Sequence, residues 1–252
     1  GVYTKIYDTR EIVVDYKRTK DGPKIDIKKF LRLIKKKKPR LICLPNSDSP
    51  TGHAFKNSEI NNILSVAKTS KSLVLIDEAY YPFYGQTSKR FLSKYENLLI
   101  TRTTAKAWGL AGLRVGFVLS SLKNINEIHK IRPMYEINNI GAQILSRILS
   151  KQRYINQSVK RLINGKKYFR SELKKIGFKV FKSEHGNFLH VDFLNDKKKI
   201  IKKLNKIVYF RHNENHPSIS GYSRFSLTSK KNFSKIIKQI RKTINKWLKL
   251  VL

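Results

Sequence analysis

The chain has 252 residues, of which 40% are hydrophobic, and its 54 Lys and Arg against 17 Asp and Glu give a formal net charge of +37. This length permits one large or two modest domains, and the composition excludes collagen, a coiled coil and a disulfide-rich scaffold. The single cysteine cannot form an internal disulfide, and no apolar run approaches the ~20 residues of a membrane helix. We therefore expect a cytoplasmic protein without a membrane span.

The positive charge is spread along the chain rather than gathered in one binding motif. Lys35 to Lys38 is the only run of four basic residues, and a second lysine cluster lies at 197–203. The aromatic residues do not interleave with arginines as they do in stacking platforms. We interpret the charge as a solvated surface that binds nucleic acid only nonspecifically. A noncatalytic polyanion-binding protein is the alternative from another functional class.

The first half of the chain alternates between helical and strand patterns. Residues 1–10 have a strand-like pattern and no initiator Met, so we expect a fragment that lacks upstream coding sequence. Apolar spacing predicts helices at 26–38 and 59–69, the second with Ser58 as N-cap. Short apolar runs predict strands at 40–44, 73–76, 97–101 and 115–120. This alternation predicts an α/β fold with a mainly parallel sheet, and polar residues follow the strands, where such sheets place their sites.

The pattern changes at about residue 139. Helices are predicted at 141–149, 159–175, 196–205 and 232–248, and strands at 177–181, 187–193, 207–210 and 222–228. We therefore predict two domains: residues 1–138 form a large domain whose N-terminal portion is missing, and residues 139–252 form a helical bridge and a smaller α+β domain.

Several polar residues stand at chemically informative places, although each alone is weak evidence. Asp77 and Glu78 end an apolar strand, and a buried Asp77 would need a cationic partner. Lys106 lies in a stretch rich in Thr, Ala and Gly, where apolar neighbours would lower its pKa and make it a nucleophile. Arg114 lies in a glycine-containing stretch that fits either a tight turn or an anion site. Arg224 alternates into a strand and points either into a cleft or into water.

Four motifs, taken together and in order, are far more specific. They are PNSDSPTG at 45–52, VLIDEAYYPFYG at 74–85, TRTTAKAWGLAGLRVGF at 101–117, and the pair VYFRHN with HPSISGYSRFSL at 208–227. They resemble the PNNPTG loop, the DEAY strand end, the lysine loop and the arginine strands of fold-type I (class I/II) pyridoxal-phosphate-dependent aminotransferases. Within that family they look like the histidinol-phosphate aminotransferases.

The resemblance implies a role for each matching residue. Lys106 would form an aldimine with the aldehyde of pyridoxal 5'-phosphate, Asp77 would pair with the ring nitrogen, and Tyr80 would bond the ring oxygen. Thr103 and Arg114 would hold the phosphate. Arg224 would bind the substrate α-carboxylate, Arg211 the distal anionic group, and Asn187 would lie beside the substrate.

Two matching positions depart from the family pattern. Ser49 stands where the family usually has an Asn that reaches the ring oxygen, and Ala105 stands where it often has a phosphate-binding Ser. We expect the shorter Ser49 side chain to bond less effectively and phosphate binding to weaken rather than vanish.

The resemblance implies a ping-pong transaminase of amino-acid biosynthesis. It would move an amino group between glutamate or 2-oxoglutarate and an anionic amine similar to histidinol phosphate, and it would be a homodimer when full length. Alternatives are a decarboxylase of a phosphorylated amino acid with the same cofactor, and a degenerate relative that binds the cofactor without turnover. No metal site is predicted, because Asn213, Asn215 and Pro217 favour a loop around His212 and His216.

Overall fold

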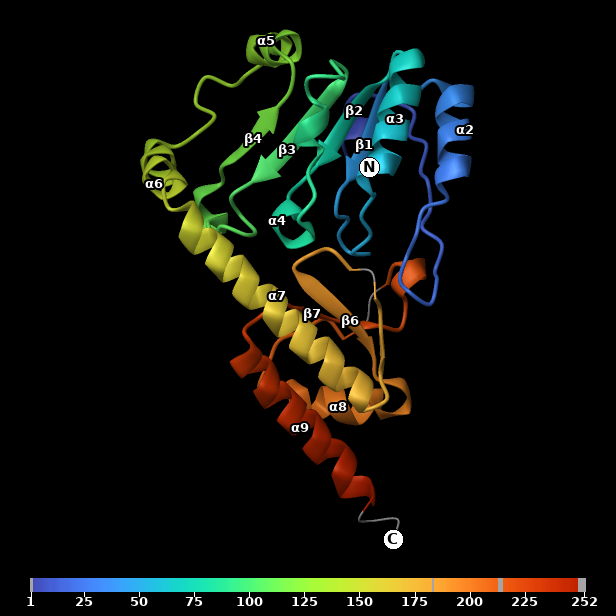
Figure 1. The fold of residues 1–252 in the computed structure, drawn as a ribbon, viewed down its shortest axis with the longest axis vertical. Coiled ribbons are helices and arrows are strands. Elements are labelled where there is room, and N and C mark those ends of the chain that lie inside the picture. The colour runs from blue at the N-terminus through green and yellow to red at the C-terminus, as the bar shows by residue number, and fades with distance from the viewer. Residues whose placement is uncertain (1, 183, 213–214, 249–252) are drawn as a thin grey trace.

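The computed structural model describes residues 2–182, 184–212 and 215–248, which form two β-sheets joined by a long helix (Figure 1). The first sheet has the order β1 (Leu41–Pro45), β2 (Leu73–Asp77), β3 (Leu98–Thr103) and β4 (Gly116–Leu119). Strands β1 to β3 are parallel, and β4 runs antiparallel to β3. The expected α/β fold with a mainly parallel sheet is therefore confirmed.

The second sheet is smaller and antiparallel. It consists of β5 (Lys179–Val180), β6 (Phe188–Asp192) and β7 (Ser223–Ser226), with β6 in the middle. Helix α7 (Gln152–Lys175) runs from the first sheet to the second, where it packs beside α9 (Lys230–Leu248). The remaining helices are α1 (Val2–Ile6), α2 (Ile27–Lys37), α3 (Asn57–Thr69), α4 (Tyr81–Tyr84), α5 (Leu122–Lys130), α6 (Asn139–Leu149) and α8 (Lys197–Leu204).

Helices α2 and α3 form the first core with one face of the first sheet. Helix α2 begins where Asp26 accepts a hydrogen bond from the Lys29 N–H at 3.0 Å, and its last turn carries lysines that favour the negative helix end. In β1, Ile42 and Leu44 are buried while their neighbours on the other face are exposed. Cys43, the single cysteine, is one of these exposed residues. Side chains on the core face include Ile34, Ile60, Leu64, Val74, Ile76, Leu98 and Ile100.

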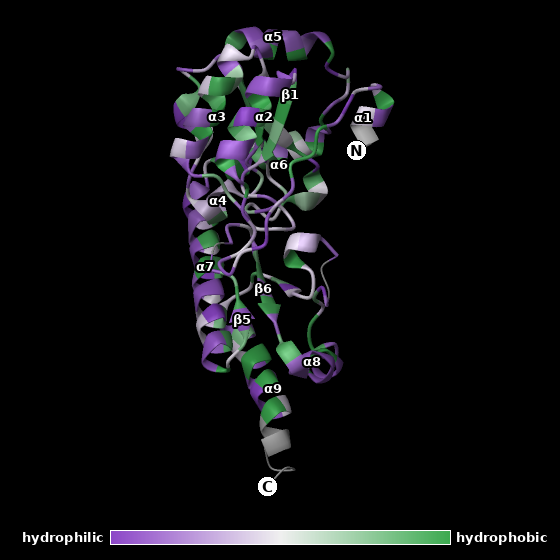
Figure 2. Cartoon of the chain, turned by 90° about the vertical axis from the view of Figure 1, so that its right-hand side faces the viewer, coloured by the Kyte–Doolittle hydropathy of each residue, from purple (hydrophilic) through white to green (hydrophobic). Residues whose placement is uncertain are grey.

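The second core lies between the smaller sheet and three amphipathic helices, α7, α8 and α9. The Phe169 ring of α7 stacks on Phe233 of α9 with centroids 4.2 Å apart, and Phe225 of β7 meets Phe169 edge-on. Figure 2 shows hydrophilic and hydrophobic residues interspersed along α7 and α9, as expected for helices with one covered face. Among the described residues, no helix is both long and apolar enough to cross a membrane.

Three predicted elements differ from the structure. Residues 2–6 form the short helix α1 rather than a strand. Five residues are too few for an alternating pattern to distinguish a strand from a helix. Helix α7 begins at Gln152 rather than at residue 159, since its first two turns are mostly solvent-exposed and lack an apolar stripe. Residues 207–210 form no named strand. Tyr209 is fully exposed, and the backbone pairing near this segment is a single isolated bridge between Arg211 and Arg224.

Candidate active site

The residues singled out in the first half of the chain gather at one edge of the first sheet. Pro45 of β1 lies opposite Asp77 of β2, and Asp77 lies opposite Thr101 of β3, so the parallel strands end together. Strand β4 begins at Gly116, opposite Thr103 at the same edge. This edge faces the second sheet (Figure 1). The loops that leave it carry Ser49, Tyr80, Lys106 and Arg114, so the candidate residues share the site-bearing edge of an α/β sheet.

A buried threonine shapes the loop that presents Lys106. The N–H and the hydroxyl of Thr104 both donate to the Val115 carbonyl, at 3.2 and 2.9 Å, and the Thr104 carbonyl accepts from the Leu110 N–H at 3.1 Å. Lys106 is part of this closed loop, and its side chain is exposed. Its Nζ lies 5.3 Å from the centre of the Tyr80 ring, within the range of a cation–π contact. The two predicted residues are thus brought together.

Phe188 connects this edge to the second sheet. Its ring meets the Tyr80 ring edge-on, with centroids 6.0 Å apart. The Arg224 Cζ in turn lies 5.0 Å from the Phe188 ring centre. A continuous path of contacts therefore runs from the Lys106 amine to the Arg224 guanidinium. Sequence reasoning missed Phe188, and its place directly after Asn187 at the start of β6 was the available signal.

Arg224 and Arg211 lie directly opposite each other. The Arg211 N–H donates to the Arg224 carbonyl at 3.1 Å, and the Arg224 N–H donates to the Arg211 carbonyl at 2.8 Å. Residues paired in this way extend their side chains from the same face of a sheet. The half-buried Asn187 is fixed beside them, because its carbonyl accepts the Leu227 N–H at 2.8 Å just after β7. The three residues predicted to bind substrate therefore lie on adjacent segments.

Asp77, Thr103 and Arg114 make local contacts within the described part of the chain. The exposed Asp77 carboxylate accepts the Ala79 N–H at 2.8 Å, and the Thr103 hydroxyl accepts the Ala105 N–H at 3.1 Å. Arg114 adopts a left-handed backbone with φ of 56° and donates to the Ala111 carbonyl at 3.1 Å. These contacts stiffen each turn at the sheet edge.

The buried carboxylate at the end of β2 is Glu78, not Asp77. Its side chain is fully buried and receives the Arg102 Nε–H and Nη2–H at 3.1 and 2.9 Å. The Thr87 hydroxyl and the Ser88 N–H donate to it as well. Successive side chains of a strand point to opposite faces, so the two carboxylates have different surroundings. The Asp77 carboxylate is exposed at the site edge, whereas the Glu78 carboxylate has its hydrogen-bond donors inside the protein.

The loop that carries Ser49 is held by its own polar residues. The buried Asp48 carboxylate accepts both the N–H and the hydroxyl of Thr51, and Asn46 Oδ1 accepts the Phe55 N–H at 2.9 Å. Ser49 itself is exposed. Gly52, with φ of 75°, closes the turn, and its carbonyl accepts the His185 N–H from the second sheet's side at 2.9 Å. Asn and Asp bonding to nearby backbone are recognisable turn signals in the sequence.

His212 and His216 have different partners. His212 Nε2 bonds Asn205 Oδ1 at 2.7 Å, and His216 Nδ1 bonds the Ser218 hydroxyl at 2.8 Å. Residues 213 and 214, between them, lie outside the described residues.

Comparisons with known proteins show the family of the chain. The family model "Aminotransferase class I and II" matches residues 2–240. The chain is 29% identical to the histidinol-phosphate aminotransferase of Caldanaerobacter subterraneus subsp. tengcongensis over 246 residues, which is 97% of this chain and 68% of that protein. It spans only 51% and 53% of the corresponding enzymes of Clostridium novyi and Thermoanaerobacter pseudethanolicus.

Solved structures share the fold. The histidinol-phosphate aminotransferase of Clostridium acetobutylicum has a TM-score of 0.83 at 23% identity, with 97% of this chain and 74% of that chain covered. The one from Sinorhizobium meliloti, solved in complex with pyridoxal-5'-phosphate, has a TM-score of 0.80 at 20% identity, with 98% and 67% covered. The ordered motifs, the fold and the family match agree, and the chain belongs to the aminotransferase class I and II family.

Proposed function

We propose that this protein is a pyridoxal-phosphate-dependent transaminase that exchanges an amino group between an anionic amine, similar to histidinol phosphate, and 2-oxoglutarate. The observation that carries the proposal is the path of contacts from Lys106 through Tyr80 and Phe188 to Arg224, with Arg211 beside it. A reactive amine at one end and two guanidinium groups at the other suit a substrate that has an amine and an anionic end.

The donor groups at the sheet edge fit pyridoxal phosphate. The Lys106 amine suits the aldehyde, the Asp77 carboxylate suits a protonated ring nitrogen, and the Tyr80 hydroxyl suits the ring oxygen, with Ser49 as a shorter second donor. The Arg114 guanidinium and the Thr103 hydroxyl suit the phosphate. Asp77, Lys106 and Arg114 are all exposed at this edge, so each is accessible to a ligand. When bound, the cofactor supplies an electron-withdrawing ring that acidifies the substrate Cα–H bond.

The chain's own residues would carry out binding and proton transfer. The Arg224 guanidinium binds the substrate carboxylate in a bidentate manner, and Arg211 binds the second anionic group. The unprotonated Lys106 Nζ accepts the proton from the substrate Cα and later releases it. Asp77, as a carboxylate, favours the protonated ring nitrogen. Ala105 offers no hydroxyl to the phosphate, which leaves that task to Thr103 and Arg114.

A test of substrate exchange separates this function from its relatives. Purified protein with pyridoxal phosphate should convert 2-oxoglutarate to glutamate only when histidinol phosphate is present, with parallel-line ping-pong kinetics. Carbon dioxide release from a phosphorylated amino acid without any keto acid would indicate a decarboxylase instead. Cofactor binding without either turnover would indicate a degenerate relative.

We also propose a homodimer located in the cytoplasm. The region from α5 to the start of α7 exposes a group of large apolar side chains, and such a group is typical of an interaction surface. Its members include Leu122, Ile131, Met134, Tyr135, Ile137, Ile140 and Leu149. Burial against a second copy would remove these side chains from water.

The division into domains at residues 138 and 139 stays a prediction.

A further inference from the structure

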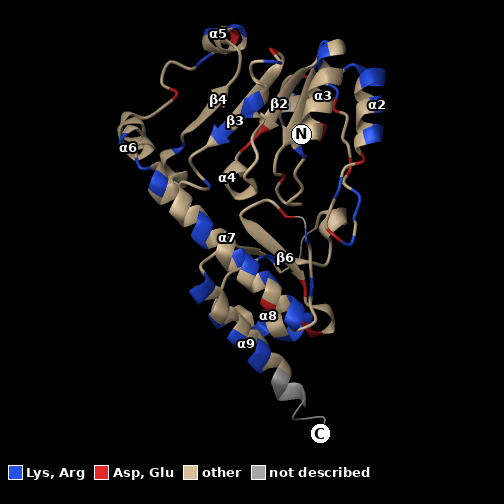
Figure 3. Ribbon diagram, viewed as in Figure 1, with Lys and Arg blue, Asp and Glu red and all other residues tan. Residues whose placement is uncertain are grey.

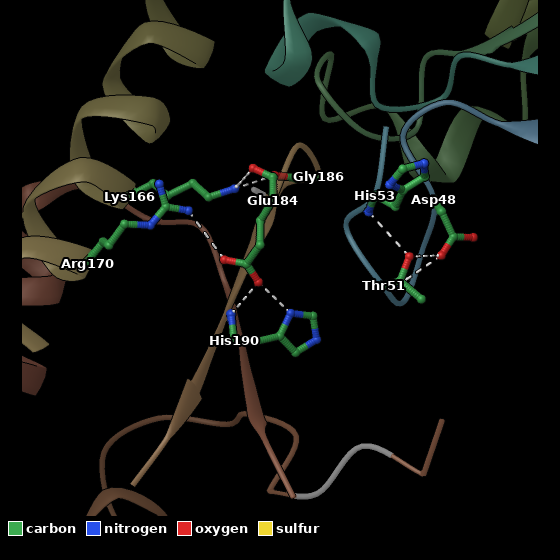
Figure 4. A network of polar contacts seen from close by, with 8 residues as sticks. All are labelled: Asp48, Thr51, His53, Lys166, Arg170, Glu184, Gly186 and His190. Atoms are coloured by element: carbon green, nitrogen blue, oxygen red, sulfur yellow. Dashed lines mark hydrogen bonds and ion pairs between the residues drawn. The ribbon is translucent and has the colours of Figure 1, made fainter. Parts of the chain in front are cut away.

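A cluster of buried and half-buried charged residues lies on α7 and on the segment that leads into β6 (Figure 4). The Glu184 side chain is fully buried, and its carboxylate accepts the His190 N–H at 2.8 Å and contacts His190 Nδ1 at 2.5 Å. Arg170 Nη2 of α7 lies 3.4 Å from the other carboxylate oxygen. One turn earlier on α7, Lys166 Nζ donates to the carbonyls of Glu184 and Gly186 at 2.8 and 3.1 Å.

These bonds fix the segment between Glu184 and His190 at both ends. The carboxylate folds forward onto a residue six positions later, and the Lys166 amine holds the carbonyls at its beginning. On the third side, Gly52 approaches so closely that an added Cβ would lie 3.3 Å from the Glu184 Cβ. The fixed segment carries Asn187 and Phe188, the two residues that enter the site.

The same cluster reaches Arg224 through two aromatic contacts. His190 lies directly opposite Arg224 in the β6–β7 pairing, so both side chains leave the same face of the sheet. The His190 ring meets the Phe188 ring edge-on at 5.5 Å, and the Phe188 ring lies 5.0 Å from the Arg224 Cζ. Phe181 and Tyr222 enclose His190 from other sides, with centroids 5.9 and 6.5 Å from its own. A shift of Glu184 would therefore displace Phe188 and the guanidinium that leans on it.

Burial of these charges is costly, so they are stable only because they are paired. A carboxylate without water needs hydrogen-bond donors, and Glu184 obtains them from His190 and Arg170. Burial lowers the pKa of Lys166 to about 8, partly offset by the attraction of Glu184. Any substitution that weakens one partner leaves the others buried and poorly satisfied, and the segment between them must move.

We propose that Glu184 is a positioning residue that sets the direction of the Arg224 guanidinium, through His190 and Phe188, and thereby the affinity for the substrate carboxylate. This inference rests on the proposed function in one respect: it takes Arg224 as the group that receives the carboxylate.

The test compares Glu184→Gln with Glu127→Gln, the same chemical change at an exposed site on α5. Single-turnover titration of each variant, loaded with pyridoxamine phosphate, with 2-oxoglutarate should show weaker binding for Glu184→Gln by about 10- to 100-fold, because a misplacement of about 1 Å can cost 100-fold. KM for 2-oxoglutarate should rise while kcat stays within about twofold, since the reacting groups at Lys106 are untouched. Glu127→Gln should behave as the parent protein.

A double-mutant cycle with Arg224→Gln separates positioning from general loss of structure. Once Arg224 is gone, Glu184→Gln should have no further effect on 2-oxoglutarate affinity, whereas independent effects would add. Additive losses, or unchanged affinity in Glu184→Gln, would overturn the inference.

An NMR measurement keeps the inference separate from the proposed function. The Arg224 Nε–H signal, assigned with Arg224→Lys, should carry a ring-current shift from Phe188 that Glu184→Gln removes and Glu127→Gln retains. A wild-type protein that shows this shift but does not bind 2-oxoglutarate would contradict the proposed function and support the positioning role. A signal that stays in place in Glu184→Gln would contradict the positioning role.

Discussion

Adjacent acidic residues at the end of β2 have opposite environments. Asp77 is exposed at the candidate site, while Glu78 is buried in an ion pair with Arg102, whose guanidinium also lies 3.9 Å from the Tyr81 ring centre. The sequence alone identifies both carboxylates but does not say which one is buried. The partner of Glu78 is 24 residues away, and no local pattern connects the two.

Breaking this buried pair should destabilise the protein strongly. Arg102→Met leaves the Glu78 carboxylate buried without its cation, and such a loss typically costs about 3–5 kcal/mol. Urea unfolding should show that loss. A second change, Glu78→Gln, made in the Arg102→Met background, should recover part of it, because the uncompensated charge is removed. A loss below about 1 kcal/mol in Arg102→Met would show that the pair is not effectively buried.

Two histidines near the Gly52 turn should make stability depend on pH. Burial is the main cause that lowers the pKa of His53 to about 4, with repulsion from His185 next, and burial followed by repulsion from Lys166 lowers the pKa of His185 to about 4. Both values lie below the ordinary 6.5, so the unfolded chain binds more protons between pH 4 and 6.5. The contribution of these two neutral histidines to the free energy of unfolding should therefore be complete above pH 6.5. The free energy of unfolding should fall as the pH decreases toward 4.

Unfolding curves across this pH range test the assignment. His53→Gln should make the pH dependence shallower, while His129→Gln, which alters an exposed histidine on α5, should leave it unchanged. An equal effect of the two substitutions would mean that burial near Gly52 is not the source of the pH dependence.

At the scale of elements, strands and helices with a clear apolar pattern were predictable, and weakly patterned ones were not. Helix α2 and strands β1 to β4 lie within a few residues of the predicted ranges, because turn residues and apolar runs define them. The strand predicted at 207–210 fails because a strand also needs backbone pairing. The Phe210 ring stacks on Phe225 of β7, but the isolated bridge to β7 lies at Arg211, just after the predicted strand. The Lys166–Glu184–His190 cluster was also unpredictable, since its members lie on different elements and follow no motif.

Gly165 shows how packing can override helix propensity. It lies within α7, where Ala would normally stabilise the helix by about 1 kcal/mol, but an added Cβ would overlap the Thr228 carbonyl oxygen between β7 and α9. Gly165→Ala should therefore destabilise the protein by about 1–3 kcal/mol. Asn164→Ala, at the neighbouring exposed position of α7, should instead stabilise the protein by a few tenths of a kcal/mol. Chemical unfolding of both variants measures this, and a stabilising Gly165→Ala would contradict the close packing.

At the scale of the whole molecule, the exposed apolar region from α5 to α7 predicts self-association. Light scattering should give a mass of two chains, and Ile140→Glu, which places a charge in this region, should shift the mass toward one chain. The exposed Lys198→Glu on α8 is the matched control and should leave the dimer intact. A dimer unaffected by Ile140→Glu would place the interface elsewhere.

The positive charge is also a property of the whole molecule. Lys and Arg recur along α7, α8 and α9 and also on the elements of the first sheet (Figure 3), consistent with a solvated surface rather than one localised binding motif. The first three family motifs, by contrast, come together at one edge of the first sheet although they are distributed from residue 45 to 117 of the sequence, and the fourth lies on the second sheet. Their order along the chain made that edge predictable, while Phe188, which connects it to the arginines, became evident only in three dimensions.

The proposed function requires that Lys106 is the residue that bonds pyridoxal phosphate. Borohydride reduction of the protein mixed with the cofactor, followed by peptide mass spectrometry, tests it most directly. We expect a single predominant adduct on the peptide that contains Lys106, lost in Lys106→Ala, retained in the surface variant Lys130→Ala, and diminished when glutamate is added before reduction. An adduct spread over several surface lysines, unchanged in Lys106→Ala, would contradict it.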